Sequence, residues 1–341
     1  MSRQHIIPRF ILKGFASRVQ KKEIFTWVYR TDGNIFETNI INVAVERFFY
    51  GPKGELCVDE EVTEFEGAIS PLIDEIRSKK NVIEITDNRI SDLICHLVTR
   101  TKHLRDSLRE SFEILTDKIG EYLSDFNNVK PLILKKPDLI KKEIKKQAKE
   151  INVPRADRRR LQKALINMYP SFLDTQKDEM ETFSKTLFEK AKSLMPKLIK
   201  EGHIKGLSQN LIPKTRVEDY RALKWFKYDT DEIVIIGDMC CLFEVTGTKE
   251  FKPLNFSDDK IMNVYLPISS RQIILGTSLP NASFVEPKLI NEQIAKCSRE
   301  FFVCSENSSE IASLIPLLGE ESEIYTKEEI AKITKDIFNN Y

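Results

Sequence analysis

The stretch 23–40, EIFTWVYRTDGNIFETNI, decides the fold class of this chain. Two runs of β-branched and aromatic residues, 23–30 and 35–40, lie on either side of Asp32, Gly33 and Asn34. An Asp-Gly step between two such runs is a strong local signal for a hairpin of antiparallel strands. The sequence therefore predicts an antiparallel sheet to which the N-terminal part of the chain contributes.

Strand-like runs return only in the last third of the chain. Residues 231–245, 261–268 and 271–276 are again rich in β-branched and aromatic side chains. Residues 289–305 follow the pattern of a helix that leads into a short strand. We therefore expect these late strands to join the early hairpin.

The middle of the chain is dominated by helical patterns. Apolar residues recur at helical spacing in the segments 86–123, 137–151, 157–168 and 174–201, the last with a break near Pro196. Strands at both ends with helices between them predict an α+β fold. Its antiparallel sheet would come from N- and C-terminal strands flanked by helices, with a large central helical insertion. The expected parts are 1–85 and 213–341 for the α+β core and 86–212 for the insertion.

Composition narrows the class of protein without naming a reaction. The chain has 341 residues, a net charge of +1, 41% hydrophobic residues and 31% charged residues. These values suit a globular protein, and no stretch approaches the length of a membrane span. The six cysteines show no Cys-x-x-Cys pair and no zinc-like spacing with histidine, so we expect buried free thiols. We predict a cytoplasmic protein without a membrane partner, and the sequence does not indicate an oligomeric state.

The charges are unevenly distributed along the chain. Residues 55–75 contain eight acids and neither Lys nor Arg, whereas residues 135–160 contain eleven basic side chains and four acids. Two solvated helix faces would explain both blocks. A more specific hypothesis is that the basic block contacts a nucleic-acid backbone or a protein partner. In the same hypothesis the acidic block is part of a metal site.

Several polar residues lie in segments that resemble a known family. The pattern His5-x-x-Pro8-Arg9-Phe-x-Leu-x-x-Phe15 resembles the opening of the bacterial proteins known as domain of unknown function 4238 (DUF4238). The resemblance continues in order through 43–50, the helix around Glu66, Arg100-Thr101, Asp238, 266–269 and Asn291. It implies a shared fold and a shared site, and it implies no particular reaction.

The polar residues of these blocks form a set suited to phosphodiester chemistry. Carboxylates and an imidazole can hold a divalent cation that activates water, while arginines stabilise charge on phosphate oxygens. We therefore predict a metal-dependent phosphodiesterase or nuclease that uses Mg²⁺ or Mn²⁺, with a toxin-like or antiphage defence role as a conjecture. The expected catalytic and metal-holding residues are His5, Glu46, Glu66 and Asp238. The expected phosphate- or substrate-binding residues are Arg9, Arg47, Arg100, Tyr50 and Ser269.

Two alternatives to this hypothesis remain open. Glu66 borders an apolar stripe, where a carboxylate often forms a buried ion pair, and Arg100 and Arg47 are its natural partners. In that case the polar set would be a structural network within a non-catalytic module that binds nucleic acid or protein. The spacing of Arg89 and His96 is also similar to that of helical ribonucleases. Those enzymes are all-helical, whereas this chain has clear strands.

Overall fold

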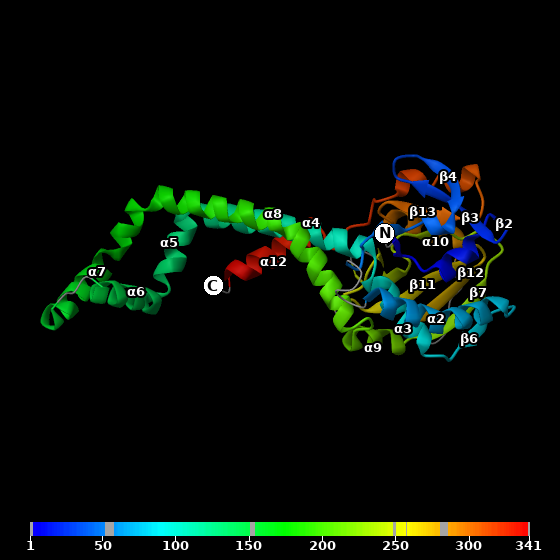
Figure 1. Ribbon diagram of the computed structural model, residues 1–341, viewed down its shortest axis with the longest axis horizontal. Coiled ribbons are helices and arrows are strands. Elements are labelled where there is room, and N and C mark those ends of the chain that lie inside the picture. Colours follow the sequence, from blue (N-terminus) through cyan, green and yellow to red (C-terminus); the bar gives the residue numbers. More distant parts are fainter. Residues whose placement is uncertain are drawn as a thin grey trace. The chain divides into compact units, whose positions relative to one another are not determined.

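The computed structural model describes residues 3–51, 58–150, 154–247, 250–256, 258–279 and 286–339. Glu55 and Cys57, and residues 151–153 of the basic block, lie outside the described residues. The predicted α+β class is confirmed, with antiparallel sheets and a large central helical region (Figure 1). Two compact parts follow from the contacts: a sheet unit, Met1–Leu108 with Ile199–Ile324, and a helical unit, Arg109–Leu198 with Tyr325–Tyr341.

One sheet of the sheet unit joins the two ends of the chain, as predicted. Strand β3 (Glu23–Arg30) pairs antiparallel with β4 (Ile35–Asn39) and also with β13 (Phe301–Cys304). The hairpin turn has Gly33 at φ +82°, a conformation that glycine adopts without strain. The sheet is completed by β2 (Arg18–Gln20) beside β3 and by β8 (Ile236–Gly237) beside β13.

The second sheet has the order β10-β9-β11-β12-β7-β6 and is also antiparallel. Its strands are β6 (Ile83–Ile85), β7 (Lys224–Asp229), β9 (Leu242–Val245), β10 (Phe251–Lys252), β11 (Ile261–Ser269) and β12 (Gln272–Thr277). A third, two-stranded sheet pairs β1 (Arg3–His5) with β5 (Val45–Arg47).

The run 231–245 is not one strand, contrary to its continuous apolar pattern. It contains β8 of the first sheet and β9 of the second, separated by a turn in which Cys240 has φ +65°. Both strands are buried, so both are apolar and periodicity cannot show the boundary between them. Asp238 therefore lies in the turn that connects the first sheet to the second.

The helices of the sheet unit include another interruption that the sequence pattern does not show. The predicted helix 86–123 is two helices, α3 (Arg89–Thr99) and α4 (Lys102–Ser124), with Arg100 at φ −106° and ψ 7° between them. The other helical segments here are α1 (Arg9–Leu12), η1 (Lys13–Phe15), η2 (Ile40–Asn42), α2 (Val58–Ser78), α9 (Lys214–Arg221), α10 (Pro287–Cys297), α11 (Ser309–Ala312) and η3 (Ile315–Leu317). The five cysteines in the described part are buried thiols that form no disulfide, as predicted.

The helical unit contains α5 (Phe126–Leu134), α6 (Pro137–Glu150), α7 (Arg155–Thr175) and α12 (Lys327–Asn339). Helices α4 and α8 (Lys177–Gln209) cross its boundary with the sheet unit. The expected break near Pro196 is wrong, because α8 continues through it. Proline removes one hydrogen bond of the helix, and contacts of α8 with α4 offset the loss: Phe188 packs against Gly120, and Lys192 pairs with Asp117.

The segments 86–108 and 199–212, assigned from the sequence to the insertion, belong to the sheet unit by their contacts. Within the described residues, no helix is long and apolar enough to cross a membrane.

Candidate active site

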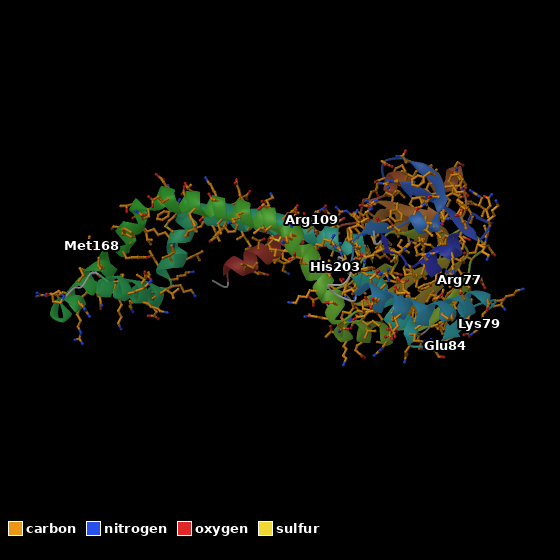
Figure 2. All side chains as sticks on the ribbon, in the orientation of Figure 1. Arg77, Lys79, Glu84, Arg109, Met168 and His203 are labelled. Carbon is orange, nitrogen blue, oxygen red and sulfur yellow. The ribbon has the colours of Figure 1, made fainter. Side chains whose placement is uncertain are left out.

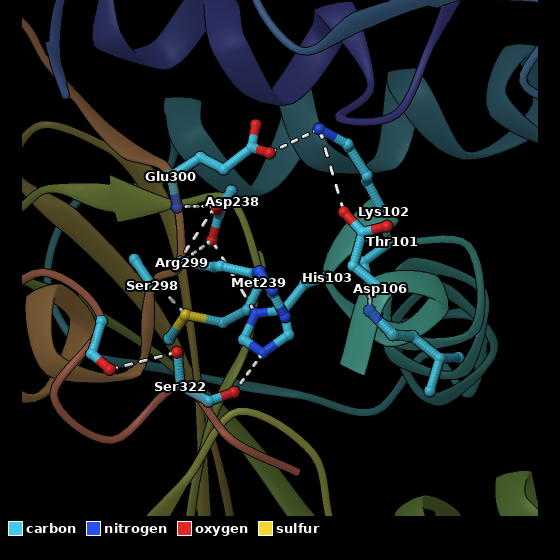
Figure 3. Close-up of polar contacts among 12 residues, drawn as sticks. Thr101, Lys102, His103, Asp106, Asp238, Met239, Ser298, Arg299, Glu300 and Ser322 are labelled. Atoms are coloured by element: carbon cyan, nitrogen blue, oxygen red, sulfur yellow. Dashed lines mark hydrogen bonds and ion pairs between the residues drawn. The ribbon is translucent and has the colours of Figure 1, made fainter. Parts of the chain in front are cut away.

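A pocket of about 210 Å³ in the sheet unit gathers charged side chains from five separate segments of the chain. These segments are the end of β3, β5, the first turns of α4, the turn after β8 and the turn before β13. The polar and charged residues that line it are Arg30, Asn42, Glu46, Lys102, His103, Asp106, Asp238, Arg299 and Glu300. Most of them appear in Figure 3, where they converge from opposite sides.

The break between α3 and α4 positions one wall of this pocket. Because α4 begins at Lys102, its first turns carry Lys102, His103 and Asp106. Lys102 and Asp106 are four residues apart and therefore share a helix face. Their Nζ and Oδ2 atoms are 3.9 Å apart.

Asp238 forms the opposite wall and holds a turn in place. Its carboxylate accepts hydrogen bonds from the backbone N–H of Arg299, at 3.0 Å, and of Glu300, at 2.6 Å. A carboxylate that accepts backbone N–H groups fixes the local chain direction and keeps its own charge solvated. The Asp238 side chain is 11% exposed, so it also remains accessible to a ligand in the pocket.

His103 is the most deeply buried titratable group on the pocket wall, with a side chain 2% exposed. Its Nε2 lies 2.6 Å from the carbonyl oxygen of Ser322. Since a carbonyl can only accept, Nε2 carries the hydrogen, and Nδ1 of the neutral ring keeps its lone pair. Within the described residues Nδ1 has no hydrogen-bond partner, and it lies 3.9 Å from Oδ1 of Asp238 (Figure 3).

Carboxylates at the pocket mouth surround an ammonium group. Lys102 donates a hydrogen bond to Glu300. Burial alone would lower the pKa of Lys102, but the hydrogen bond and charge of Glu300, with the charges of Asp106 and Glu46, raise it. Lys102 is therefore charged at neutral pH. Glu46 lies 3.7 Å from Arg105 and 3.9 Å from Lys200.

Glu46, Asp106 and Glu300 are the pocket residues that could hold a divalent cation, because hard cations prefer carboxylate oxygens. In the arrangement described, no three His, Cys, Asp or Glu side chains of the described residues stand close enough to form a metal site. A cation at this pocket would need the carboxylates to rotate toward it.

A second polar group, the Arg100 cluster, lies near the pocket in the sheet unit. It consists of Arg100, Glu66, His96, Tyr50 and the backbone of His5. The fully buried Arg100 donates to the Glu66 carboxylate, to Nε2 of His96 at 2.7 Å and to the His5 carbonyl. Its guanidinium carbon lies 5.6 Å from the centre of the Tyr50 ring. The cluster connects β1, α2 and α3, and the buried ion pair considered from the sequence is present.

His96 in this cluster is held neutral. Burial, followed by the positive charge of Arg100, keeps the pKa of His96 well below its ordinary value. The ring also packs against Phe65, with centres 4.6 Å apart. Arg89, its proposed ribonuclease partner, is at the surface and bonds Asp87. The two residues are therefore in different environments.

The structure divides the predicted site residues between these two places. Glu46 and Asp238 line the pocket, whereas Glu66, Tyr50, Arg100 and the His5 carbonyl belong to the Arg100 cluster. The four expected metal ligands do not form one site, since no three His, Cys, Asp or Glu side chains of the described residues come together and Glu66 is paired with Arg100. The other three lie elsewhere: Arg9 and Arg47 are exposed, and Ser269 bonds Gln272 in a turn.

Sequence reasoning missed Lys102, His103, Asp106, Arg299 and Glu300. A signal for two of them exists, because Lys102 and Asp106 are four apart directly after the Arg-Thr pair. Whether Lys102 and Asp106 reach the pocket depends on where α4 starts. The apolar pattern of the sequence runs through that point without interruption. Arg299 and Glu300 precede a strand and resemble ordinary turn residues.

Comparison with known proteins supports the family resemblance. The model of the family described as "Protein of unknown function (DUF4238)" matches residues 3–307, which include the pocket and the Arg100 cluster. No curated protein and no solved structure shows a significant match. Because the match covers most of the chain, this protein belongs to the DUF4238 family.

Proposed function

We propose that the pocket is the active site of a phosphodiesterase that cleaves nucleic acid with the help of a divalent cation. The observation that carries the proposal is the lone pair on Nδ1 of His103, which is buried and 3.9 Å from the Asp238 carboxylate. Once substrate binding opens Nδ1 to the pocket, a base in this position can accept a proton from an attacking water molecule. Phosphodiester hydrolysis requires such a step.

The surroundings of His103 suit that role. When Nδ1 accepts a proton, the ring becomes a cation, and Nε2 keeps its hydrogen bond to the Ser322 carbonyl. The negative charge of Asp238 then stabilises the cation. Asp238 acts here as a positioning and stabilising residue, and it remains tied to the backbone of Arg299 and Glu300.

The remaining charges of the pocket suit an anionic substrate and a metal ion. Glu46, Asp106 and Glu300 would hold Mg²⁺ or Mn²⁺, which polarises a phosphoryl oxygen when bound. Arg30 and Arg299 line the same pocket and would contact the phosphate. Of the carboxylates predicted from the sequence, the proposal keeps Glu46 and Asp238, and His103 takes the place of His5.

The choice of nucleic acid rests on the basic block. Residues 135–160 carry eleven basic side chains against four acids. Within this segment the structure describes α6 and the first turns of α7, which belong to the helical unit. Such a surplus of positive charge favours contact with a phosphate backbone.

The test combines thermal unfolding with hydrolysis of a labelled oligonucleotide. We expect Mn²⁺ or Mg²⁺ to raise the Tm of the wild type and to be required for cleavage. Glu46→Gln should remove the Tm rise and the cleavage, and His103→Gln should remove the cleavage alone. Glu218→Gln, an exposed carboxylate on α9 away from the pocket, is the matched control and should behave as wild type.

A wild-type protein with no Tm change and no cleavage in either metal would contradict the proposal. The remaining interpretation would then be a non-catalytic binding module.

A further inference from the structure

A second cavity lies entirely within the helical unit, between α5, α6 and α7. It is a groove of about 950 Å³. Its floor is apolar and consists of Leu132, Ile133, Leu139, Ile140 and Tyr169. Its rim is basic and consists of Lys136, Lys142, Lys145 and Lys146, with Glu143 as the one acid among the lining residues. We call it the α5–α7 groove.

The lysines of the α5–α7 groove are available to a ligand. All four are exposed, and in the described part of the chain none of their ammonium groups is paired with a carboxylate. Four positive charges around one cavity repel one another, so an anionic ligand would relieve that repulsion. The charge of the rim therefore selects a ligand with several negative charges.

Aromatic and apolar side chains continue from the groove along α7. Tyr169 lines the floor, and its ring centre lies 6.2 Å from that of Phe172. Phe172 is 55% exposed and Met168, labelled in Figure 2, is 65% exposed. Tyr169 is half-buried and Phe172 is exposed, and accessible flat rings beside a basic rim are the arrangement on which unpaired bases stack.

We propose that the α5–α7 groove binds single-stranded nucleic acid. The lysines contact the phosphates, and the apolar floor with Tyr169 and Phe172 contacts the bases. A duplex keeps its bases stacked inside and would leave the floor and the rings unused. An acidic peptide would match the rim, but the net excess of seven basic side chains in 135–160 and the two rings favour a polyanion with aromatic bases.

This inference rests on the proposed function only for the substrate class, nucleic acid. The inference adds that the nucleic acid is single-stranded. It also adds a binding site in the helical unit, formed by residues separate in sequence from those of the catalytic pocket.

The experiment measures binding of the full-length protein to fluorescein-labelled oligothymidylate of about 20 nucleotides, and to a hairpin duplex of similar length. Fluorescence anisotropy is recorded in EDTA, so that cleavage cannot interfere. The groove variant is Lys142→Gln/Lys145→Gln/Lys146→Gln. Its matched control is Lys177→Gln/Lys185→Gln/Lys190→Gln, which removes the same charge from exposed positions on α8 that do not line the groove.

We expect the wild type to prefer the single strand at least about tenfold. The groove variant should weaken that binding about tenfold or more and lower the slope of log Kd against log salt by about 2, as three lost phosphate contacts require. The control should stay within about threefold of wild type. Phe172→Ala, an exposed substitution that leaves the core intact, should weaken binding about tenfold, whereas Phe172→Trp should retain it.

Equal affinity for duplex and single strand, or equal losses in the groove and control variants, would overturn the inference. Binding of a fluorescein-labelled polyglutamate peptide without any binding of the oligonucleotide would also overturn it and assign the groove to a protein partner. A failure of the proposed function is distinguishable, because it would abolish metal-dependent cleavage and leave the single-strand binding intact.

Discussion

The pocket and the Arg100 cluster each contain a buried histidine beside charged side chains, yet their hydrogen bonds run in opposite directions. In the cluster, His96 accepts a hydrogen bond from Arg100, and burial followed by the positive charge of Arg100 keeps its pKa well below the ordinary value. In the pocket, His103 donates to a carbonyl and faces a carboxylate with its lone pair. The direction of one hydrogen bond therefore separates a histidine that supports the fold from one that can accept a proton.

The two regions also differ in what surrounds them. Arg100 and its partners lie among packed core residues and are not among the residues that line the pocket. A buried ion pair of this kind is weak evidence for net stability, but removal of one partner leaves a buried charge without compensation. The largest effect of a substitution in the cluster should thus be on folding, and in the pocket on catalysis.

The largest expected effect follows from Arg100→Ala. It removes the hydrogen bonds to Glu66, His96 and the His5 carbonyl, so we expect a loss of about 3–5 kcal/mol in the free energy of unfolding. Urea denaturation followed by circular dichroism measures it. Arg89→Ala, which removes an exposed ion pair with Asp87, is the control and should cost far less, because exposed ion pairs contribute little to stability. Equal losses would show that the cluster is not structurally special.

The second effect is a contrast between substitutions of the two histidines, His103 in the pocket and His96 in the Arg100 cluster. His103→Gln should lower the rate of metal-dependent cleavage about 100-fold or more with a small change in Tm, because a proton acceptor is lost. His96→Gln should lower the Tm and leave the rate per folded molecule within about threefold. Parallel rate and melting measurements decide the matter. The proposed difference between a catalytic histidine in the pocket and a structural histidine in the cluster is wrong if His103→Gln retains full activity. It is also wrong if His96→Gln inactivates a folded protein.

The third effect is a dependence of the free energy of unfolding on pH. His203 is the test case, because it is a histidine that the fold holds neutral. Burial, with the positive charge of Arg105, lowers the pKa of His203 to about 4, whereas an unfolded chain has a histidine pKa of about 6.5. Below pH 6.5 the unfolded state binds the proton more readily, so stability falls as pH falls toward 4. We expect His203 to contribute a loss of about 2 kcal/mol between pH 7 and pH 5.

His96 should add a loss of the same sign, because its pKa is also lowered. Urea denaturation at the two pH values measures the sum. In a His203→Gln variant the pH-dependent part should shrink, although the variant itself is less stable at pH 7. A stability that stays constant from pH 7 to pH 5 would mean that these rings are not held neutral.

The smallest effect is on the stability of Glu46→Gln. Glu46 is 32% exposed, and its partners Arg105 and Lys200 are 3.7 and 3.9 Å away, so the free energy of unfolding should change by less than about 0.5 kcal/mol. The same substitution should remove the Tm rise in Mn²⁺. A destabilisation of several kcal/mol would place Glu46 with the structural residues of the Arg100 cluster.

Much of the fold could be predicted from the sequence because its signals are local. The Asp32-Gly33 turn determines the β3–β4 hairpin, and the helical spacing of apolar residues marks the central helices. The boundary between α3 and α4 escaped prediction, since Arg100 departs from helical geometry to satisfy distant partners, Glu66 and the His5 carbonyl. Local patterns carry no information about such partners.

The candidate site shows the same limit more strongly. Glu46 and Asp238 were identified as candidates, but their neighbour His103 depends on a carbonyl oxygen 219 positions later in the chain, that of Ser322. Which nitrogen of a histidine carries its proton depends on such a partner. The amino-acid sequence shows that a histidine is present at position 103 but not which of its ring nitrogens carries the hydrogen.

The pairing of β3 with β13 has a consequence for when the pocket can form during synthesis. Trp27 is opposite Cys304 in that pairing, and the pocket needs Glu46, Lys102, Asp238 and Glu300 together. Because Glu300 comes last of these residues in the chain, the pocket cannot be complete until the segment that contains β13 has been synthesised. Fragments that end before Glu300 therefore lack one wall of the pocket.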